Sequence, residues 1–228
     1  MTELFMADLD LRSLATSSNP TSALADPYAA YGKRMLDLII ALLLLPVLVP
    51  MIVIMCLLVR RDGARGLFAH QRVGQNGVPF TCWKIRTMVP DAQTRLARLL
   101  ATDADAAAEW ARTQKLTDDP RVTRLGRFLR RTSLDELPQI WNVLRGDMSL
   151  VGPRPVTEEE LGHYGALRGT YLTLKPGVTG PWQVHGRSNG CFKERLDLDQ
   201  GYASDMGLWR DLSLIAQTSL VLLRPTGR

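Results

Sequence analysis

Two adjacent carboxylates, Asp135 and Glu136, are the residues of this sequence best suited to chemistry on a phosphate group. Arg130 and Arg131 come shortly before them, and Arg154 follows between two prolines. The planar guanidinium group of arginine can bind two phosphate oxygens at once, and a carboxylate among such groups can attack phosphorus or hold a divalent metal ion. This stretch is therefore a candidate site for phosphate chemistry.

The same carboxylates also fit a structural role at the start of a helix. Ser133, with Glu136 three residues later, matches a capping box, and acidic residues favour the first helical turn. Pro138 comes late for a helix capped at Ser133, but it falls in the first turn of a helix that begins nearer Asp135. Both alternatives place the carboxylates at a helix N-terminus, where free N–H groups also attract phosphate. The local pattern alone favours the structural role.

Length, charge and cysteine content limit what the chain can be. Its 228 residues are enough to bury a core, and one domain with attached segments is the simplest organisation. The formal net charge of +5 predicts attraction to nucleic acid, anionic lipid or a phosphorylated substrate, without choosing among them. The three cysteines, Cys56, Cys82 and Cys191, are scattered, which argues against a zinc site or a disulfide framework and fits a reducing compartment.

The strongest physical signal is an uncharged apolar stretch of 22 residues, 38–59, with basic residues on both sides. A continuous helix of that length is ~33 Å long, enough to cross the hydrocarbon core of a bilayer. Pro46 and Pro50 interrupt its middle, since each removes a backbone donor and clashes with the preceding turn. Because both ends are basic, we predict that residues 32–61 form a re-entrant helix, break and helix. A spanning helix and a buried core helix are the alternatives.

The segments outside this stretch carry weaker signals. Residues 1–31 are weakly patterned and lack a secretory signal, which predicts a mobile tail. Residues 68–88 hold two β-prone runs around Asn76 and Gly77, a pair that predicts a hairpin turn. Lys84 and Arg86, two residues apart in the second run, are expected on one face of a strand.

Helical periodicity covers most of the chain after the hairpin. Residues 91–116 are expected to form one packing helix. Residues 121–131 have a basic and an apolar face, which suits either a helix at a membrane interface or an ordinary surface helix. Residues 157–174 are expected to be partly helical, residues 175–184 to form a proline and glycine loop, and residues 208–223 to form a second amphipathic segment. The expected fold is therefore mostly helical α+β, with a re-entrant N-terminal helix, interfacial helices and a small β-hairpin.

Several short motifs accompany the carboxylate pair in a fixed order, at residues 33–37, 71–74, 84–88, 146–149, 152–155 and 175–180. Together they resemble the bacterial sugar transferase family, the polyprenyl-phosphate phosphoglycosyl transferases that begin exopolysaccharide and glycan assembly. The chain looks most like the minimal exopolysaccharide-initiating galactosyl- or glucosyl-1-phosphate transferases, which lack further N-terminal membrane helices. It departs from the family at Leu45, where a serine often precedes the proline, so a hydroxyl bond to the freed backbone is missing.

This resemblance implies a two-step transfer of a sugar-1-phosphate from a UDP-sugar to undecaprenyl phosphate. Asp135 would attack the phosphorus that bears the sugar and release UMP, and the lipid phosphate would then collect the phosphosugar. Mg²⁺ is the implied cofactor, held by Asp135 and Glu136, with Glu136 handling the metal or a proton. Residues 146–149 would give structural support, with Asp147 a weaker metal candidate. The residues that would bind substrate phosphates are Lys84, Arg86, Arg130 and Arg154.

With these motifs in register, the catalytic role of the carboxylate pair outweighs the structural one. The acceptor lipid stays in the bilayer while nucleotide sugars arrive from the cytosol, so residues 62–228 are expected to form a catalytic domain at the cytoplasmic face of the bacterial inner membrane. The expected partners are the UDP-sugar, undecaprenyl phosphate, membrane lipids and downstream glycosyltransferases, but not nucleic acid. A glycosyltransferase that releases UDP and a non-catalytic membrane scaffold for polysaccharide assembly are the alternatives. The sequence leaves the sugar and the oligomeric state open.

Overall fold

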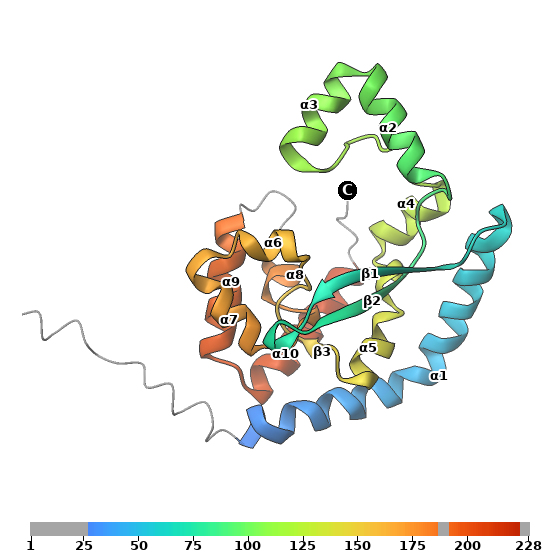
Figure 1. Cartoon of the computed structure of the whole chain (residues 1–228). Coiled ribbons are helices and arrows are strands. Elements are labelled where there is room, and N and C mark those ends of the chain that lie inside the picture. The colour runs from blue at the N-terminus through green and yellow to red at the C-terminus, as the bar shows by residue number, and fades with distance from the viewer. Residues whose placement is uncertain (1–26, 187–191, 224–228) are drawn as a thin grey trace, which may run out of the picture.

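The computed structural model describes residues 27–186 and 192–223, and Figure 1 shows their arrangement. The chain is a mostly helical α+β protein with a small antiparallel hairpin, which confirms the predicted fold class. The longer helices are α1 (Lys33–Val59), α2 (Ala92–Thr102), α3 (Ala104–Thr113), α9 (Phe192–Ser204) and α10 (Leu208–Leu223). The shorter helices are α4 (Arg124–Arg131), α5 (Gln139–Arg145), α6 (Glu158–Gly162), α7 (Arg168–Thr173) and α8 (Pro181–His185). The strands are β1 (Leu67–Val73), β2 (Pro79–Ile85), β3 (Ser149–Val151) and β4 (Gly177–Thr179).

The tail predicted over residues 1–31 includes a helical turn at its C-terminal end. A π-helical turn, Tyr28–Gly32, leads directly into α1. Tyr28 donates a hydrogen bond of 2.5 Å to the carboxylate of Asp211 in α10, so this turn is fastened to the far end of the sequence. Residues 1–26, which make up the rest of the predicted tail, lie outside the described residues.

Helix α1 is one bent helix, whereas the sequence predicted two helices separated by a break. Pro46 and Pro50 both lie inside it, and its ribbon changes direction along its length (Figure 1). Prolines spaced one turn apart remove backbone donors and add steric pressure on the same side of the helix, which bends it without ending it. The structure thus replaces the predicted break with a bend, and the path of this helix through a membrane stays a prediction.

Most apolar side chains of α1 face outward. Among the described residues, the segment Tyr28–Val59 is the one helix long and apolar enough to cross a membrane, and only 6% of its most apolar window is buried. A core helix of a soluble protein would be mostly buried, so this exposure argues against the core-helix alternative and favours contact with lipid. The exposed apolar residues of α1 are Met35, Ile39, Leu42, Leu43, Leu44, Val47, Val49, Val53, Ile54 and Leu57.

Three charged residues near the start of α1 fasten this helix to the rest of the fold. The Lys33 ammonium lies 2.6 Å from the carboxylate of Asp211, which is buried in α10. Arg34 donates hydrogen bonds to two carbonyls at the C-terminal end of α5, at 2.6 and 2.8 Å. Asp37, itself buried, accepts hydrogen bonds from a hydroxyl and an N–H group of β3. The motif at residues 33–37 therefore holds α1 against α5 and β3.

The hairpin of β1 and β2 is confirmed, with its turn where Asn-Gly predicted one. Asn76 and Gly77 adopt positive φ angles of 58° and 79°, the region that this pair favours in hairpin turns. The antiparallel register places Phe68 directly opposite Lys84. Because side chains alternate between the two faces of a strand, Phe68 and Lys84 share one face of the hairpin, and Trp83 lies on the other.

A second pair of short strands, β3 and β4, is parallel and was not predicted. Their neighbouring loops approach very closely, since a Cβ atom on Gly177 would lie 2.1 Å from the backbone nitrogen of Gly152. Only glycine fits at such an approach, which explains the glycines of these two motifs. Arg154 follows shortly after β3, so this pairing fixes where its loop begins.

Several predicted elements needed correction. The single helix expected over residues 91–116 is two, α2 and α3, which project together from the rest of the protein (Figure 1). Asp103 separates them because its backbone is extended and its side chain accepts a hydrogen bond from Ala106 N–H, which starts a new helix. The predicted helix at residues 121–131 begins later, at α4. The predicted loop at residues 175–184 contains β4 and α8.

Helix α5 lies in the main hydrophobic core, which joins α1, β2, β3, α9 and α10. Its buried members are Ala41, Phe80, Cys82, Ile140, Val143, Met148, Leu150, Val151, Leu174, Tyr202 and Leu214. The buried amide side chain of Asn142 adds a polar tie to β2, because it accepts from Trp83 N–H at 3.2 Å and donates to the Thr81 carbonyl at 2.7 Å. The turn just before α5 therefore rests on a rigid support.

Candidate active site

Asp135 and Glu136 lie in a short 3-10 turn, Leu134–Glu136, between α4 and α5. The predicted capping box is wrong: Ser133 adopts a positive φ of 55°, and its side chain makes no capping hydrogen bond within the described chain. Pro138 immediately precedes α5, where its missing N–H needs no helical partner. The carboxylates therefore do lie at the N-terminal side of a helix, as expected, but in a separate turn.

Glu136 is held by two of the predicted basic residues. The Lys84 ammonium donates a hydrogen bond of 2.6 Å to Glu136 Oε1, and the Arg154 guanidinium lies 3.8 Å from the same oxygen. Burial by itself would raise the pKa of Glu136, but the charges of Arg154 and Lys84 outweigh it and hold that pKa below its usual range. Glu136 is therefore ionised at neutral pH.

Asp135 has the opposite shift, although it is the next residue. Its side chain is buried, with 9% of the residue exposed. Burial raises the pKa of Asp135 to about 6, the negative charge of Glu136 adds to the rise, and Lys84 and Arg130 oppose it. At neutral pH Asp135 is thus mostly ionised but poorly solvated, which is a suitable state for a nucleophile.

The structure gives the other two predicted phosphate ligands different positions. Arg130 donates a hydrogen bond of 2.9 Å to the hydroxyl of buried Thr87, and its charge lowers the pKa of Asp135, so it belongs to this site. Arg86 donates instead to three backbone carbonyls, those of Val59, Arg65 and Met88, at 3.1, 2.7 and 2.8 Å. Arg86 therefore fastens the end of α1 to the hairpin, and its predicted phosphate-binding role stays a prediction.

Arg72 is a site residue that the sequence reasoning missed. Its guanidinium donates to Glu160 at 2.7 Å, and its charge contributes to the lowered pKa of Glu136. Its place in the register, four pairs along the hairpin from the pair of Phe68 and Lys84, puts Arg72 on the same face as Lys84. The motif at residues 71–74 was the available signal, but its role depends on the register, which the sequence alone did not give.

Arg195 is a second missed residue, and it acts through Arg154. Although it is charged, only 7% of Arg195 is exposed. Its guanidinium donates a hydrogen bond of 3.0 Å to the backbone carbonyl of Arg154 and lies 3.8 Å from Asp199, which also accepts from the Tyr164 hydroxyl at 3.1 Å. This buried cluster fixes the backbone that presents Arg154 to Glu136.

The carboxylate pair fits the expected magnesium ion, although the ion itself stays a prediction. Within the described ranges, no group of three or more His, Cys, Asp or Glu residues could hold a metal. Mg²⁺ needs fewer protein ligands, because it commonly binds through one or two carboxylates together with substrate phosphates. Asp135 and Glu136 would supply those carboxylates. Asp147, the weaker candidate, follows the opposite end of α5, where it accepts from Asn142 at 3.2 Å.

Comparison with known proteins identifies relatives along almost the whole chain. Residues 28–225 match a family described as bacterial sugar transferase. The chain is 45% identical over 204 residues to the UDP-galactose-lipid carrier transferase of Erwinia amylovora and 44% identical over 204 residues to the undecaprenyl-phosphate galactose phosphotransferase of Salmonella typhimurium. Each alignment covers 90% of this chain but 43% of the relative, so the chain spans less than half the length of these proteins.

A relative of more similar length is the exopolysaccharide production protein ExoY of Sinorhizobium fredii. The identity is 42% over 193 residues, which cover 84% of this chain and 85% of that protein. The six motifs and the carboxylate pair all fall within the matched region of 28–225.

Proposed function

The chain belongs to the bacterial sugar transferase family, and on this premise we propose that it transfers a sugar-1-phosphate from a UDP-sugar to undecaprenyl phosphate and releases UMP. The product would start the assembly of an exopolysaccharide or a related glycan. One observation carries the proposal: buried Asp135 lies beside Glu136, which Lys84 and Arg154 hold, in a chain with an exposed apolar helix.

The proposed reaction has two displacement steps at one phosphorus atom. First, an Asp135 carboxylate oxygen attacks the phosphorus that bears the sugar, and the bond to the bridging oxygen breaks, so that UMP leaves with that oxygen and its electron pair. Second, an oxygen of undecaprenyl phosphate attacks the same phosphorus. The aspartyl–phosphorus bond then breaks, Asp135 regains its carboxylate, and undecaprenyl diphosphate-sugar is released.

The charges around Asp135 address the main obstacle to the first step, which is repulsion between an anionic nucleophile and an anionic diphosphate. Lys84 and Arg154 already lie beside Glu136, and Arg130 lies where its charge acts on Asp135. These cations can bind the phosphate oxygens as the donor enters. When bound, Mg²⁺ would be held by Asp135 and Glu136 and would neutralise further phosphate charge.

The placement of the protein follows from its substrates. Undecaprenyl phosphate keeps its hydrocarbon chain in the bilayer, and the UDP-sugar is soluble, so the site must lie at a membrane surface. The exposed apolar side chains of α1 suit that position, and the cytoplasmic face of the inner membrane supplies the nucleotide sugar. The membrane-bound product would pass to downstream glycosyltransferases.

The proposal is tested by identifying the nucleotide product. We expect the purified protein to release UMP from a UDP-sugar, tested as a panel that includes UDP-galactose and UDP-glucose, when Mg²⁺ and undecaprenyl phosphate are present. Label in the β-phosphate should appear on the protein before acceptor is added, and it should be absent from Asp135→Asn. A matched control is Asp118→Asn, because the Asp118 side chain is 96% exposed. Release of UDP, or full turnover by Asp135→Asn, would contradict the proposal.

A further inference from the structure

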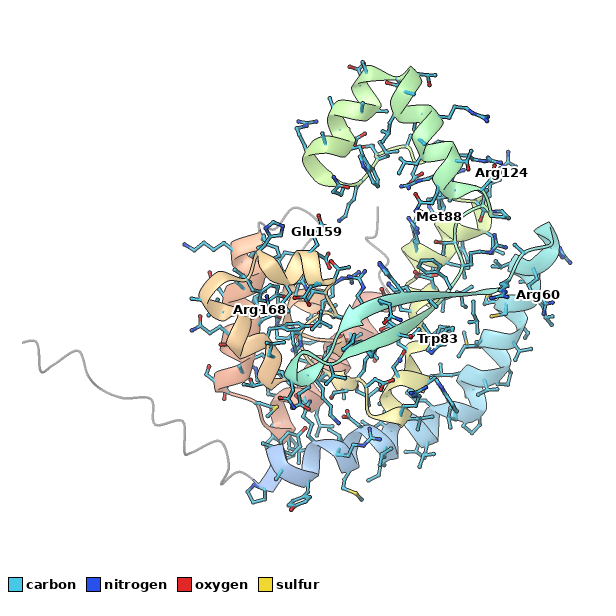
Figure 2. All side chains as sticks on the ribbon, in the orientation of Figure 1. Arg60, Trp83, Met88, Arg124, Glu159 and Arg168 are labelled. Carbon is cyan, nitrogen blue, oxygen red and sulfur yellow. The ribbon has the colours of Figure 1, made fainter. Side chains whose placement is uncertain are left out.

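A groove of about 610 Å³ opens at the base of the hairpin, where α1 ends and β1 begins. Its apolar lining comes from both elements and from β2, and two exposed arginines, Arg60 and Arg65, also line it. Figure 2 labels Arg60 where α1 ends and Trp83 on the side of the hairpin nearest that helix. We call this feature the hairpin-base groove, and its main apolar residues are Cys56, Leu67, Phe68 and Trp83.

The hairpin-base groove touches both faces of the hairpin. Trp83 lies on one face, whereas Phe68 shares the other face with Lys84, its direct partner in the register. Lys84 in turn donates to Glu136 at 2.6 Å. Lys84 does not line the groove, but Phe68 does, so the groove ends beside the strand pair that carries Lys84 to the carboxylate pair.

The other end of the groove meets the apolar surface of α1. Val53, Ile54 and Leu57 are exposed on the same half of α1 that contributes Cys56 to the groove. Leu67 and Phe68 are also exposed, at 43% and 48%, although they line the groove together with Arg60 and Arg65. Apolar side chains in that position suit a hydrocarbon ligand, and the two arginines suit an anionic one.

We propose that the hairpin-base groove holds the isoprenoid chain of the polyprenyl phosphate acceptor and guides its phosphate from the bilayer to Lys84. A long hydrocarbon chain with a single phosphate matches a groove that is apolar beside α1, is lined by two arginines, and includes Phe68, the direct strand partner of the lysine at the carboxylate pair. The inference rests on the function proposed above, and it adds the place where the lipid substrate binds.

The experiment compares a long acceptor with a short one. Leu67→Gln and Trp83→Ala each change the groove without changing the residues that contact Glu136. With undecaprenyl phosphate in phosphatidylcholine vesicles, we expect KM for the acceptor to rise about five-fold or more, because losing about 40 Å² of apolar contact weakens binding by that factor. With an isoprenyl phosphate of two isoprene units, which is too short to fill the groove, KM should change less than about two-fold.

Val78→Gln is the matched control, because Val78 is 62% exposed at the opposite end of the same hairpin. It should leave both acceptor KM values unchanged. The amount of UMP released before acceptor is added counts the competent enzyme in each sample. If wild-type protein releases no UMP, the proposed function fails, whereas normal UMP release with equal KM changes for both acceptors overturns only the groove assignment. The groove assignment also fails if phosphatidylglycerol in the vesicles reproduces the KM rise in wild-type protein, since the groove would then hold an ordinary phospholipid.

Discussion

Two buried aspartates, Asp135 in the turn before α5 and Asp199 in α9, have nearly the same acidity and very different surroundings. Burial raises the pKa of each to about 6. Glu136 adds to the rise at Asp135, whereas the charge of Arg195 and the hydrogen bond from Tyr164 oppose the rise at Asp199. A raised pKa is therefore common to both regions and does not by itself identify the catalytic one.

The regions differ in what their cations are free to do. The side chain of Arg154 is 41% exposed and that of Lys84 is 20% exposed, so both can contact a ligand while they remain beside Glu136. The Arg195 side chain is 9% exposed, and its guanidinium is already committed to Asp199 and to the Arg154 backbone. Asp135 thus lies among cations that can receive a phosphate, and Asp199 lies in a cluster that supports them.

The largest expected effect is the difference in the rate of UMP release between variants of the two aspartates. Asp135→Asn should lower the rate of UMP release by about a thousand-fold or more, because the variant lacks the nucleophile. Asp199→Asn should lower it by less than about ten-fold, because Asp199 acts only through Arg195 and Arg154. Both rates are measured with saturating UDP-sugar and acceptor. A loss as large in Asp199→Asn as in Asp135→Asn would remove the distinction between the regions.

A second prediction concerns Lys84 and Arg86, at the C-terminal end of β2. It again separates a residue that can contact a phosphate from one that supports the fold. Lys84→Met should reduce kcat/KM for the UDP-sugar by about a hundred-fold, since it removes a cation from the reacting charges. Arg86→Met should reduce kcat/KM much less and instead lower the apparent Tm, because it deletes hydrogen bonds to three backbone carbonyls. Thermal unfolding and steady-state kinetics on both variants check this. Unfolding of Arg86→Met at the wild-type temperature, with a hundred-fold loss of kcat/KM, would contradict this distinction and support a phosphate-binding role for Arg86.

These two basic residues also show how far sequence reasoning reached. A regular strand predicts Lys84 and Arg86 on one face, but β2 ends at Ile85, so Arg86 leaves the strand and turns to the end of α1. The exact end of a strand depends on tertiary contacts, which the local pattern does not contain. The same limit explains the bend of α1, because prolines predict a disturbance but not its size.

The carboxylate pair and the hairpin could be predicted because their signals are local. Asp135 and Glu136 are neighbours in the sequence, and the Asn-Gly turn is set by the backbone preferences of two residues. The contacts of Arg72 and Arg195 join residues that are far apart in the sequence, so they required the register of β1 with β2 and the packing of α9. The support of a site was therefore harder to predict than its central residues.

The pH dependence of the rate gives a third test, because both aspartates titrate near the same pH. In wild-type protein the rate should fall below about pH 6, where Asp135 becomes protonated and stops being a nucleophile. Asp199→Asn should keep this acid limb in place. Glu136→Gln should move the limb to lower pH, because it removes the negative charge that raises the pKa of Asp135. If the acid limb disappeared in Asp199→Asn, the limb would report the titration of Asp199 and the assignment to Asp135 would be wrong.

The smallest expected effect is on stability, and it concerns Asp199 itself. Its folded-state pKa of about 6 lies above the ordinary value of 3.8, so the folded protein binds this proton more tightly than the unfolded chain does. The stabilisation is complete below the ordinary value and is lost as pH rises through about 6. Asn cannot ionise and does not lose this stabilisation. The difference in apparent Tm between Asp199→Asn and wild type should therefore shift in favour of the variant, by a few degrees, as pH is raised from about 4.5 to about 7.5.

Asp199 also forms an ion pair with Arg195, so the pH dependence of the apparent Tm shows whether burial or pairing dominates at Asp199. If the 3.8 Å pair stabilised the ionised carboxylate more than burial destabilises it, Asp199→Asn would lose in apparent Tm relative to wild type over the same pH range. Asp118→Asn, whose side chain is 96% exposed, should follow wild type at every pH and corrects for other titrations. A relative gain for Asp199→Asn would mean that burial outweighs pairing at Asp199. Asp199 would then be a supporting residue retained for the position of Arg195, at some loss of stability.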